Sequence, residues 1–424
     1  MRRLLLATCF LLPGLAAQAA PEITMLTSDD PALRLGRFAF PGGKVLEMSV
    51  GIGSAAHHRP GDPADIVYTL SDRGPNFACS EAEDISGLPA AKLCAEDLRG
   101  RVYPAPSYAP TLYGLRLLPE QRRFALFEAI ALKRPDGQPI TGLTNPLPGR
   151  TEQPLDGAGR RLAHDPSAID AEGLIRLPDG SFWVGEENGP SLVEVAPDGR
   201  IRRRVVPAGT ASEFAGAGYP VVEGLPAILA RRQSNRGIES LTGTPDGATL
   251  YALLQNPLAH PDAAAFRAAR NTRLLRYDPA GNRVTGEWVY QLDDPRSFRN
   301  DPSDRQSDPR ISEMAWLGPD RLLVLERTEK TTKLYEVRLD GGATNILGSS
   351  WDDPATRPSL EQGGAGVVPL EKRLVLDSAD HPELPGKLEG IALLPGGVLM
   401  LINDDDFGIT GERTRIALIR GVLN

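Results

Sequence analysis

The stretch AEGLIRLPDGSFWVGEENGP, residues 171–190, contains a pattern that returns three more times along the chain. Each copy has a glutamate, a short apolar run, a proline six positions after the glutamate, and a second apolar run that ends in a polar residue. The glutamates and their prolines are Glu172 with Pro178, Glu239 with Pro245, Glu313 with Pro319, and Glu389 with Pro395. A period of roughly 70 residues predicts an array of β units in which equivalent side chains approach one another.

The rest of each repeat also predicts short strands separated by tight turns. A fifth copy, DIVYTLSDRGPN at 65–76, keeps only the second half of the pattern, and the 44 glycines and 38 prolines favour turns over helices. Four strands per repeat are typical of a propeller blade. We therefore predict an all-β fold, a β-propeller of five to six four-stranded blades, in a single domain over 21–424.

Three segments outside the repeats have predicted roles of their own. Segments 135–166 and 293–310 are rich in proline, aspartate or glycine and are expected to be long loops on one face. The N-terminal segment 33–40 is a candidate for the strand that closes the ring. The alanine-rich segment 262–270 predicts a brief helix.

The N-terminus has the features of a secretory signal peptide over 1–20. Two arginines, Arg2 and Arg3, precede an apolar run over 4–15, and Ala17 and Ala19 form an A-x-A cleavage site. No later segment is apolar for long enough to predict a membrane helix. We therefore expect a periplasmic or secreted protein without a membrane span.

Cysteine use fits an oxidising compartment. Cys9 lies in the signal peptide, so the mature chain would keep Cys79 and Cys94, which flank a short polar loop. An even count in an exported protein predicts a disulfide between them, and two buried thiols are the alternative.

The chain is acidic, with a formal net charge of −8 and an isoelectric point near 5.4. Loss of Arg2 and Arg3 with the signal peptide would bring the charge to about −10. Sequence-independent nucleic-acid binding needs a basic face, so we expect no nucleic-acid partner. We expect a monomer that acts on a small anionic or ester substrate.

The repeated glutamates predict a ring of carboxylates around the propeller axis. Several carboxylates close together repel one another, so some must take up protons, pair with arginines or bind a divalent cation. Ligands that are all oxygen favour calcium over zinc. The candidate metal ligands lie where second strands end, and they are Asp72, Glu186, Glu187, Asn188, Asn403 and Asp404. In the alternative, the glutamates only hydrogen-bond adjacent blades and bind no metal.

Several motifs together resemble a known family. They are SDRGPN at 71–76, DAEGL at 170–174, EENGP at 186–190, RGIESL at 236–241, and LEGIALLP with INDDDFG near the C-terminus. In order and spacing they look like the bacterial phytase-like family, also described as esterase-like activity of phytase. The resemblance implies an exported β-propeller with hydrolytic activity on phosphate or other esters. The Glu-Gly motif is also similar to that of calcium-dependent propeller lactonases.

These observations give a specific functional expectation. Calcium at the channel mouth would polarise an ester oxygen and activate a water molecule. The expected catalytic residues are Glu172, Glu239, Glu313 and Glu389. Arg73, Arg236 and Arg327 are expected to bind the anionic group of the substrate, although a salt bridge between blades is the alternative for each. A propeller that binds a ligand or a protein without catalysis, and a calcium-dependent sugar lactonase, are the competing functions.

Overall fold

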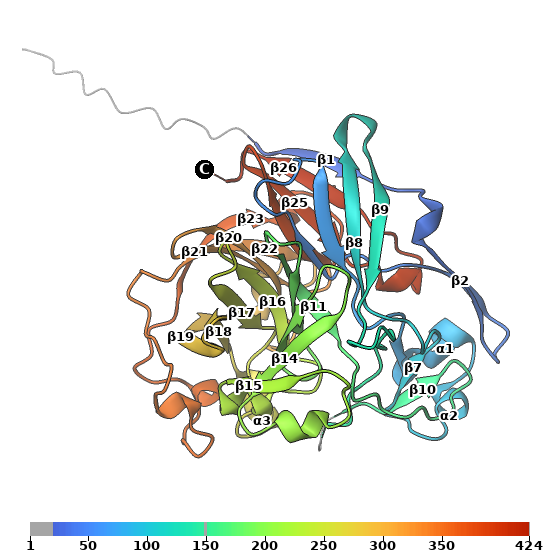
Figure 1. Cartoon of the computed structure of the whole chain (residues 1–424), viewed down its shortest axis with the longest axis horizontal. Coiled ribbons are helices and arrows are strands. Elements are labelled where there is room, and N and C mark those ends of the chain that lie inside the picture. The colour runs from blue at the N-terminus through green and yellow to red at the C-terminus, as the bar shows by residue number, and fades with distance from the viewer. Residues whose placement is uncertain (1–19, 148–150, 424) are drawn as a thin grey trace, which may run out of the picture.

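The structure, a computed structural model, describes residues 20–147 and 151–423 and is built mostly of strands with few helices (Figure 1). The all-β class expected from the sequence is confirmed. The predicted signal peptide, apart from its last residue, lies outside the described residues. No helix in the described ranges is long and apolar enough to cross a membrane.

Five sheets of four or five strands contain 21 of the 26 strands in the described residues. The first contains β4 (Ala55–His57), β5 (Ile66–Leu70), β8 (Thr111–Leu118) and β9 (Arg123–Ala131). The second contains β11 (Ala171–Arg176), β12 (Phe182–Glu186), β13 (Ser191–Val195), β14 (Ile201–Pro207) and β15 (Val221–Leu225). The third contains β16 (Ile238–Gly243), β17 (Leu250–Leu254), β18 (Asn271–Asp278) and β19 (Arg283–Gln291). The fourth contains β20 (Arg310–Gly318), β21 (Arg321–Arg327), β22 (Thr332–Arg338) and β23 (Glu371–Asp377). The fifth contains β24 (Leu388–Leu394), β25 (Val398–Asn403), β26 (Ile416–Arg420) and β1 (Glu22–Leu26).

The two ends of the described chain meet in the fifth sheet, where β1 pairs antiparallel with β26 (Figure 1). The sequence suggested 33–40 for a closing role, but that segment forms β2 (Arg34–Ala39), which pairs with β3 (Val45–Ser49) in a separate hairpin. Burial explains the difference. Leu26 at the end of β1 is fully buried between sheets, whereas no residue of β2 is buried.

The first strands of the five sheets contact one another in a closed order, β4 to β11, β16, β20, β24 and back to β4. Their approach is close enough to explain the glycine that follows two of the repeat glutamates. A β-carbon added to Gly173 would lie 2.3 Å from the backbone nitrogen of Leu241 on the next first strand. One added to Gly390 would lie 2.9 Å from the backbone of Ala55.

The apolar core is divided among the spaces between adjacent sheets. On β12, Phe182 and Val184 pack in the cluster that includes Leu70 of the first sheet. Trp183, between them in sequence, packs in the cluster that includes Leu241 of the third sheet. Alternate side chains of a strand point to opposite faces, so both faces of this sheet are buried. This is why the second strands are continuous apolar runs.

The remaining elements are small. A three-stranded sheet contains β6 (Phe77–Ala78), β7 (Arg101–Tyr103) and β10 (Pro154–Asp156). The α-helices are α1 (Ala82–Ser86), α2 (Ala90–Leu93) and α3 (Ala263–Ala268), the last being the brief helix expected from the alanine-rich segment. Short 3-10 helices cover Pro31–Leu33, Cys79–Glu81, Pro119–Gln121, Ala211–Phe214, Ala227–Arg231, Pro295–Ser297, Ser350–Asp352, Leu360–Gln362, Ser378–Asp380 and Asp406–Gly408. Cys79 and Cys94 form the predicted disulfide beside α1 and α2.

Candidate metal and anion site

A cavity of about 400 Å³ lies where the first strands begin and the second strands end. Its charged lining consists of ten carboxylates and six cationic side chains from the described residues. The carboxylates are Asp72, Glu81, Asp170, Glu172, Glu187, Glu239, Glu329, Glu389, Asp404 and Asp406. The cations are Arg73, Arg101, Arg236, Arg310, Arg327 and Lys387. The repeat therefore brings three of its four glutamates into one charged cavity.

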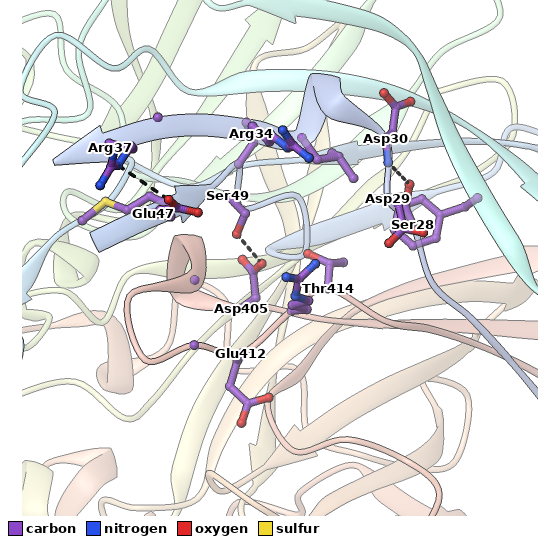
Figure 2. A pocket seen from close by; sticks show the side chains of 18 residues that line it. Ser28, Asp29, Asp30, Arg34, Arg37, Glu47, Ser49, Asp405, Glu412 and Thr414 are labelled. Carbon is purple, nitrogen blue, oxygen red and sulfur yellow. Dashed lines mark hydrogen bonds and ion pairs between the residues drawn. The ribbon is translucent and has the colours of Figure 1, made fainter. Parts of the chain in front are cut away.

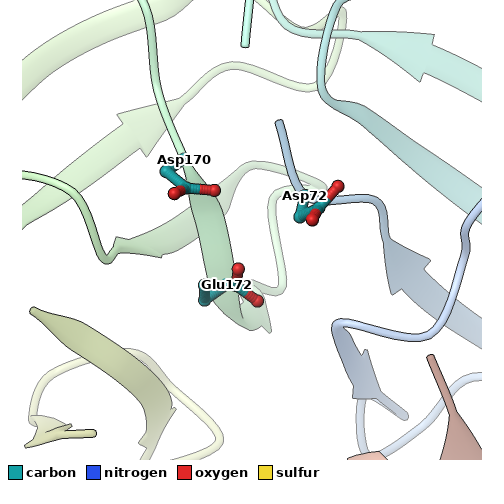
Figure 3. Close-up of side chains that lie close together, drawn as sticks. All are labelled: Asp72, Asp170 and Glu172. Carbon is teal, nitrogen blue, oxygen red and sulfur yellow. The ribbon is translucent and has the colours of Figure 1, made fainter. Parts of the chain in front are cut away.

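One side of the cavity holds carboxylates at very short separation. Oxygens of Asp72, Asp170 and Glu172 all lie within 4.8 Å of one another (Figure 3). The same holds for oxygens of Glu172, Glu187 and Glu239. Glu172 belongs to both groups. We call these five residues the carboxylate cluster.

Several oxygens of the carboxylate cluster lack hydrogen-bond donors. Neither carboxylate oxygen of Asp170 has a hydrogen-bond partner in the structure, although Oδ2 lies 3.3 Å from Nη1 of Arg73. Oε2 of Glu239 is also without one. Both side chains are 4% exposed. Buried acceptors without donors are unfavourable, and a bound cation would satisfy them.

The pKa values of the cluster reflect burial and the crowding of carboxylates. Burial and repulsion from Glu239 raise the pKa of Glu172 well above its usual range. Burial and the charge of Asp404 do the same for the pKa of Asp72. Burial, with repulsion from Glu389, raises the pKa of Glu239 to about 8. The residues present therefore fit a divalent cation, since two overlapping groups of three carboxylates lie there, four of the five residues being buried, and calcium prefers such oxygen ligands.

The opposite side of the cavity is different, because all of its carboxylates are paired, whereas in the carboxylate cluster only Asp170 and Glu187 contact an arginine. Glu389 pairs with Arg327, and Glu329 pairs with Arg310. Nζ of Lys387 lies 2.9 Å from Asp404 and 2.6 Å from Asp406. We call this group the paired side.

The pKa values on the paired side follow from these contacts. Burial raises the pKa of Glu389 to about 7, although Arg327 opposes the shift. Burial would also raise the pKa of Asp404, but Lys387 holds it below its usual value. Burial is likewise outweighed at Glu329, where Arg310 and Arg327 lower the pKa to about 2.

The three arginines expected to bind substrate all line the cavity, and each contacts a carboxylate. Nη1 of Arg73 lies 3.3 Å from Glu152 as well as from Asp170. Nη1 of Arg236 lies 3.3 Å from Glu187. Arg327 is 3% exposed and also donates to the hydroxyl of Ser312. The salt bridges expected in the alternative interpretation are thus present, and they fix the guanidinium groups at the cavity wall.

Four of the expected site residues do not line the cavity. Glu313 accepts hydrogen bonds from the backbone N–H groups of Leu241 and Met314 at 3.0 and 2.9 Å. Glu186 is fully buried and pairs with Arg204 at 2.7 Å.

The two asparagines have structural contacts of the same kind. Asn188 is buried and accepts a hydrogen bond from Arg232 through its backbone carbonyl. The side chain of Asn403 bonds the backbone of Arg413 and Arg415. At these four positions the structure shows contacts that hold neighbouring segments together.

The sequence-based list omitted several residues of the cavity, above all Asp170, Arg310 and Lys387. Each lies two or three positions before a repeat glutamate, as Arg236 does. Asp170 and Lys387 lie two positions before their glutamates, and residues two apart on a strand point to the same face, so this position should have drawn attention. Arg101 and Glu329 also line the cavity but lie outside the repeated pattern, and no comparable signal marks them.

A second cavity, of about 520 Å³, lies between the β2–β3 hairpin and the loop before β26 (Figure 2). Asp405 lines this cavity and accepts a hydrogen bond from Ser49 at 2.9 Å. Its neighbours Asp404 and Asp406 line the charged cavity instead. The run of three aspartates is therefore divided between two surfaces and does not form one acidic cluster.

Comparison with known proteins finds a fungal relative that is called secreted. An uncharacterized secreted protein of Arthroderma benhamiae is 30% identical over 307 residues, which cover 61% of this chain and 58% of that protein. The chain thus matches less than two thirds of the length of this relative.

Solved structures give only distant likeness. An aldose sugar dehydrogenase from Streptomyces coelicolor in its PQQ-bound form is 12% identical, with a TM-score of 0.34 over 95% of this chain and 98% of that chain. The Malassezia sympodialis allergen Mala s 1 is 10% identical, with a TM-score of 0.36 over 91% and 81%. Scores this low carry no argument about function. The family model described as "Esterase-like activity of phytase" matches residues 101–407, and the chain therefore belongs to the phytase-like family.

Proposed function

We propose that this protein is an exported, calcium-dependent hydrolase of phosphate or other esters, built as a five-bladed β-propeller. The carboxylate cluster is the single observation that carries the proposal. Four buried carboxylates and the half-buried Asp72 form two overlapping groups there, and three of their oxygens lack a hydrogen-bond donor among the described residues. A fold that only needed hydrogen bonds between sheets would supply donors, as it does for Oε1 of Glu313, although not for its Oε2.

Three further observations support the proposal. The family is described by an esterase-like activity. The disulfide between Cys79 and Cys94 suits an oxidising compartment, and the fungal relative is called secreted. The closed order of contacts among β4, β11, β16, β20 and β24 is the arrangement expected of five blades around an axis.

The residues have separate roles in this scheme. Asp72, Asp170, Glu172, Glu187 and Glu239 would hold the cation. When bound, calcium supplies a Lewis acid that polarises an ester oxygen and makes a bound water more acidic. Arg73, Arg236 and Arg327, each fixed by a carboxylate, would orient the anionic part of the substrate. Glu313 has no part in the proposed chemistry, because both of its hydrogen bonds are to backbone and it does not line the cavity.

A hydrolase panel with matched variants tests the proposal. The purified protein would be assayed on p-nitrophenyl phosphate, p-nitrophenyl acetate and a sugar lactone, before and after removal of calcium by a chelator. Glu172→Gln should lower kcat/KM by about 100-fold or more, because it removes the carboxylate shared by both groups. The control is Glu287→Gln, a fully buried, arginine-paired carboxylate that does not line the cavity.

Two outcomes would contradict the proposal. One is activity that persists after exhaustive chelation and in Glu172→Gln. The other is saturable ligand binding with no turnover of any of the three substrate classes, which would favour a propeller that binds without catalysis. Turnover of the lactone alone would favour the lactonase.

A further inference from the structure

Two cationic side chains of the paired side have partners that reach them from the exterior. Arg310 begins β20, and Lys387 directly precedes β24. Their side chains are only 15% and 25% exposed. Their carboxylate partners are far more accessible, since the side chain of Glu329 is 59% exposed and that of Asp406 is 49% exposed.

These two ion pairs are adjacent. The backbone N–H of Lys387 donates to the backbone carbonyl of Glu329 at 3.0 Å. Glu329 occupies the turn between β21 and β22, and Asp406 lies in the loop after β25. Neither carboxylate belongs to a strand, so each side chain can rotate away without disturbing a sheet.

More positive charge surrounds the pairs. Burial lowers the pKa of Arg310, and the charge of Arg327 lowers it further. Arg236 contributes in the same direction. Arg236, Arg310 and Arg327 all line this cavity, so an anion placed beside Arg310 would be attracted by all three.

We infer that Arg310 and Lys387 form an anion-binding subsite for a phosphate or carboxylate group, and that Glu329 and Asp406 occupy it until an anionic ligand displaces them. The inference rests on the proposed function only in taking this cavity as the substrate site. Each pair has a carboxylate that is about half exposed and therefore screened by solvent, so exchanging that carboxylate for a ligand anion costs little free energy. A phosphate can accept two hydrogen bonds from one guanidinium, which the single contact from Glu329 does not match.

The proposal makes an unusual prediction, because removing a charged side chain from the cavity should improve binding. The Kd for inorganic phosphate would be measured by isothermal titration calorimetry, with and without calcium. Glu329→Gln should tighten phosphate binding about fivefold, the equivalent of one exposed ion pair. Asp406→Asn should act in the same direction, and asparagine tolerates the positive φ of 47° at this position.

Two further variants complete the experiment. Arg310→Gln should weaken phosphate binding by about fivefold or more, because it removes a cation of the subsite. The control is Glu336→Gln, which removes a carboxylate paired with Arg321 at 2.8 Å but not lining the cavity, and it should leave the Kd unchanged. Melting temperatures would confirm that each variant is folded.

The outcomes separate this inference from the proposed function. If Glu329→Gln leaves phosphate binding unchanged or weakens it, the inference is wrong even if esters are hydrolysed. If phosphate binds more tightly to Glu329→Gln while no ester is turned over, the subsite stands and the proposed function fails. The KM for neutral p-nitrophenyl acetate should not respond to Glu329→Gln, because that ester carries no charge to compete with the carboxylate.

Discussion

The carboxylate cluster and the paired side are two halves of one cavity, and they solve the same electrostatic problem in different ways. On the paired side, Glu389, Glu329 and Asp404 each have a cation supplied by the chain. In the carboxylate cluster, Asp170 and Glu239 keep oxygens without donors. Equivalent positions of the repeat serve both halves, so symmetry alone does not decide which is paired. Within the cluster only Asp170 and Glu187 are paired, with Arg73 and Arg236, so we expect the cluster to gain more from a cation in solution than the paired side does.

The largest effect is expected from breaking the paired side at its most buried contact. Arg327 is 3% exposed and pairs with Glu389, so Arg327→Met would leave a buried carboxylate without its cation. Losing one partner of a buried pair costs about 3–5 kcal/mol in the free energy of unfolding. Urea unfolding would measure this loss, and the double variant Arg327→Met with Glu389→Leu should recover much of it. A loss below about 1 kcal/mol would show that the pair is screened like a surface contact.

The next largest effect concerns the carboxylate cluster and its expected stabilisation by calcium. Calcium at 100 times its Kd should stabilise the protein by about 2.7 kcal/mol, because it binds only the folded chain. Glu172→Gln should abolish most of this gain, while Glu287→Gln should keep it. Without calcium the order should reverse, with Glu172→Gln more stable than the wild type, since it removes one of several repelling charges.

Thermal unfolding with and without calcium would measure both effects. Equal melting temperatures with and without calcium would mean that the cluster holds no calcium. A calcium response kept in Glu172→Gln would mean that the ion binds elsewhere.

The sequence predicted the repeat glutamates of the site and missed several of the charged residues around them. Glu172, Glu239 and Glu389 meet at the cavity because strand order places equivalent positions together. Glu313 has the same position in the repeat but turns toward the backbone N–H of Leu241, and the direction of one side chain is set by local donors that periodicity does not describe. Counting back six residues from Pro60 gives Ser54, so the fifth copy has no glutamate. Its carboxylate comes from Asp72, at the end of the second half that the sequence did reveal.

The ion pairs of the cavity were not predictable from the repeat. Glu329 reaches Arg310 from a turn whose position depends on the length of β21 and β22. Asp170 was visible within DAEGL, but only its contacts distinguish a cavity carboxylate from a solvated one. The fold class follows from composition and period, whereas the charge balance of each half follows from contacts between distant segments.

The smallest effect shows how much a carboxylate paired with two lysines contributes to the free energy of unfolding. Asp293, outside the cavity, lies 2.9 Å from Nζ of Lys333 and 2.6 Å from Nζ of Lys372. Burial would raise its pKa, but Lys372 and the other donors lower it to about 2. A carboxyl whose pKa is depressed by folding stabilises the protein above its unfolded pKa near 4, and the stabilisation disappears as the pH falls toward 2. Asp293→Asn should therefore cost about 2 kcal/mol at neutral pH, and the difference from wild type should shrink as the pH falls from 4 to 2. Urea unfolding across this range checks the sign, and a difference that stays constant with pH would show that the lysines contribute through packing and not through charge.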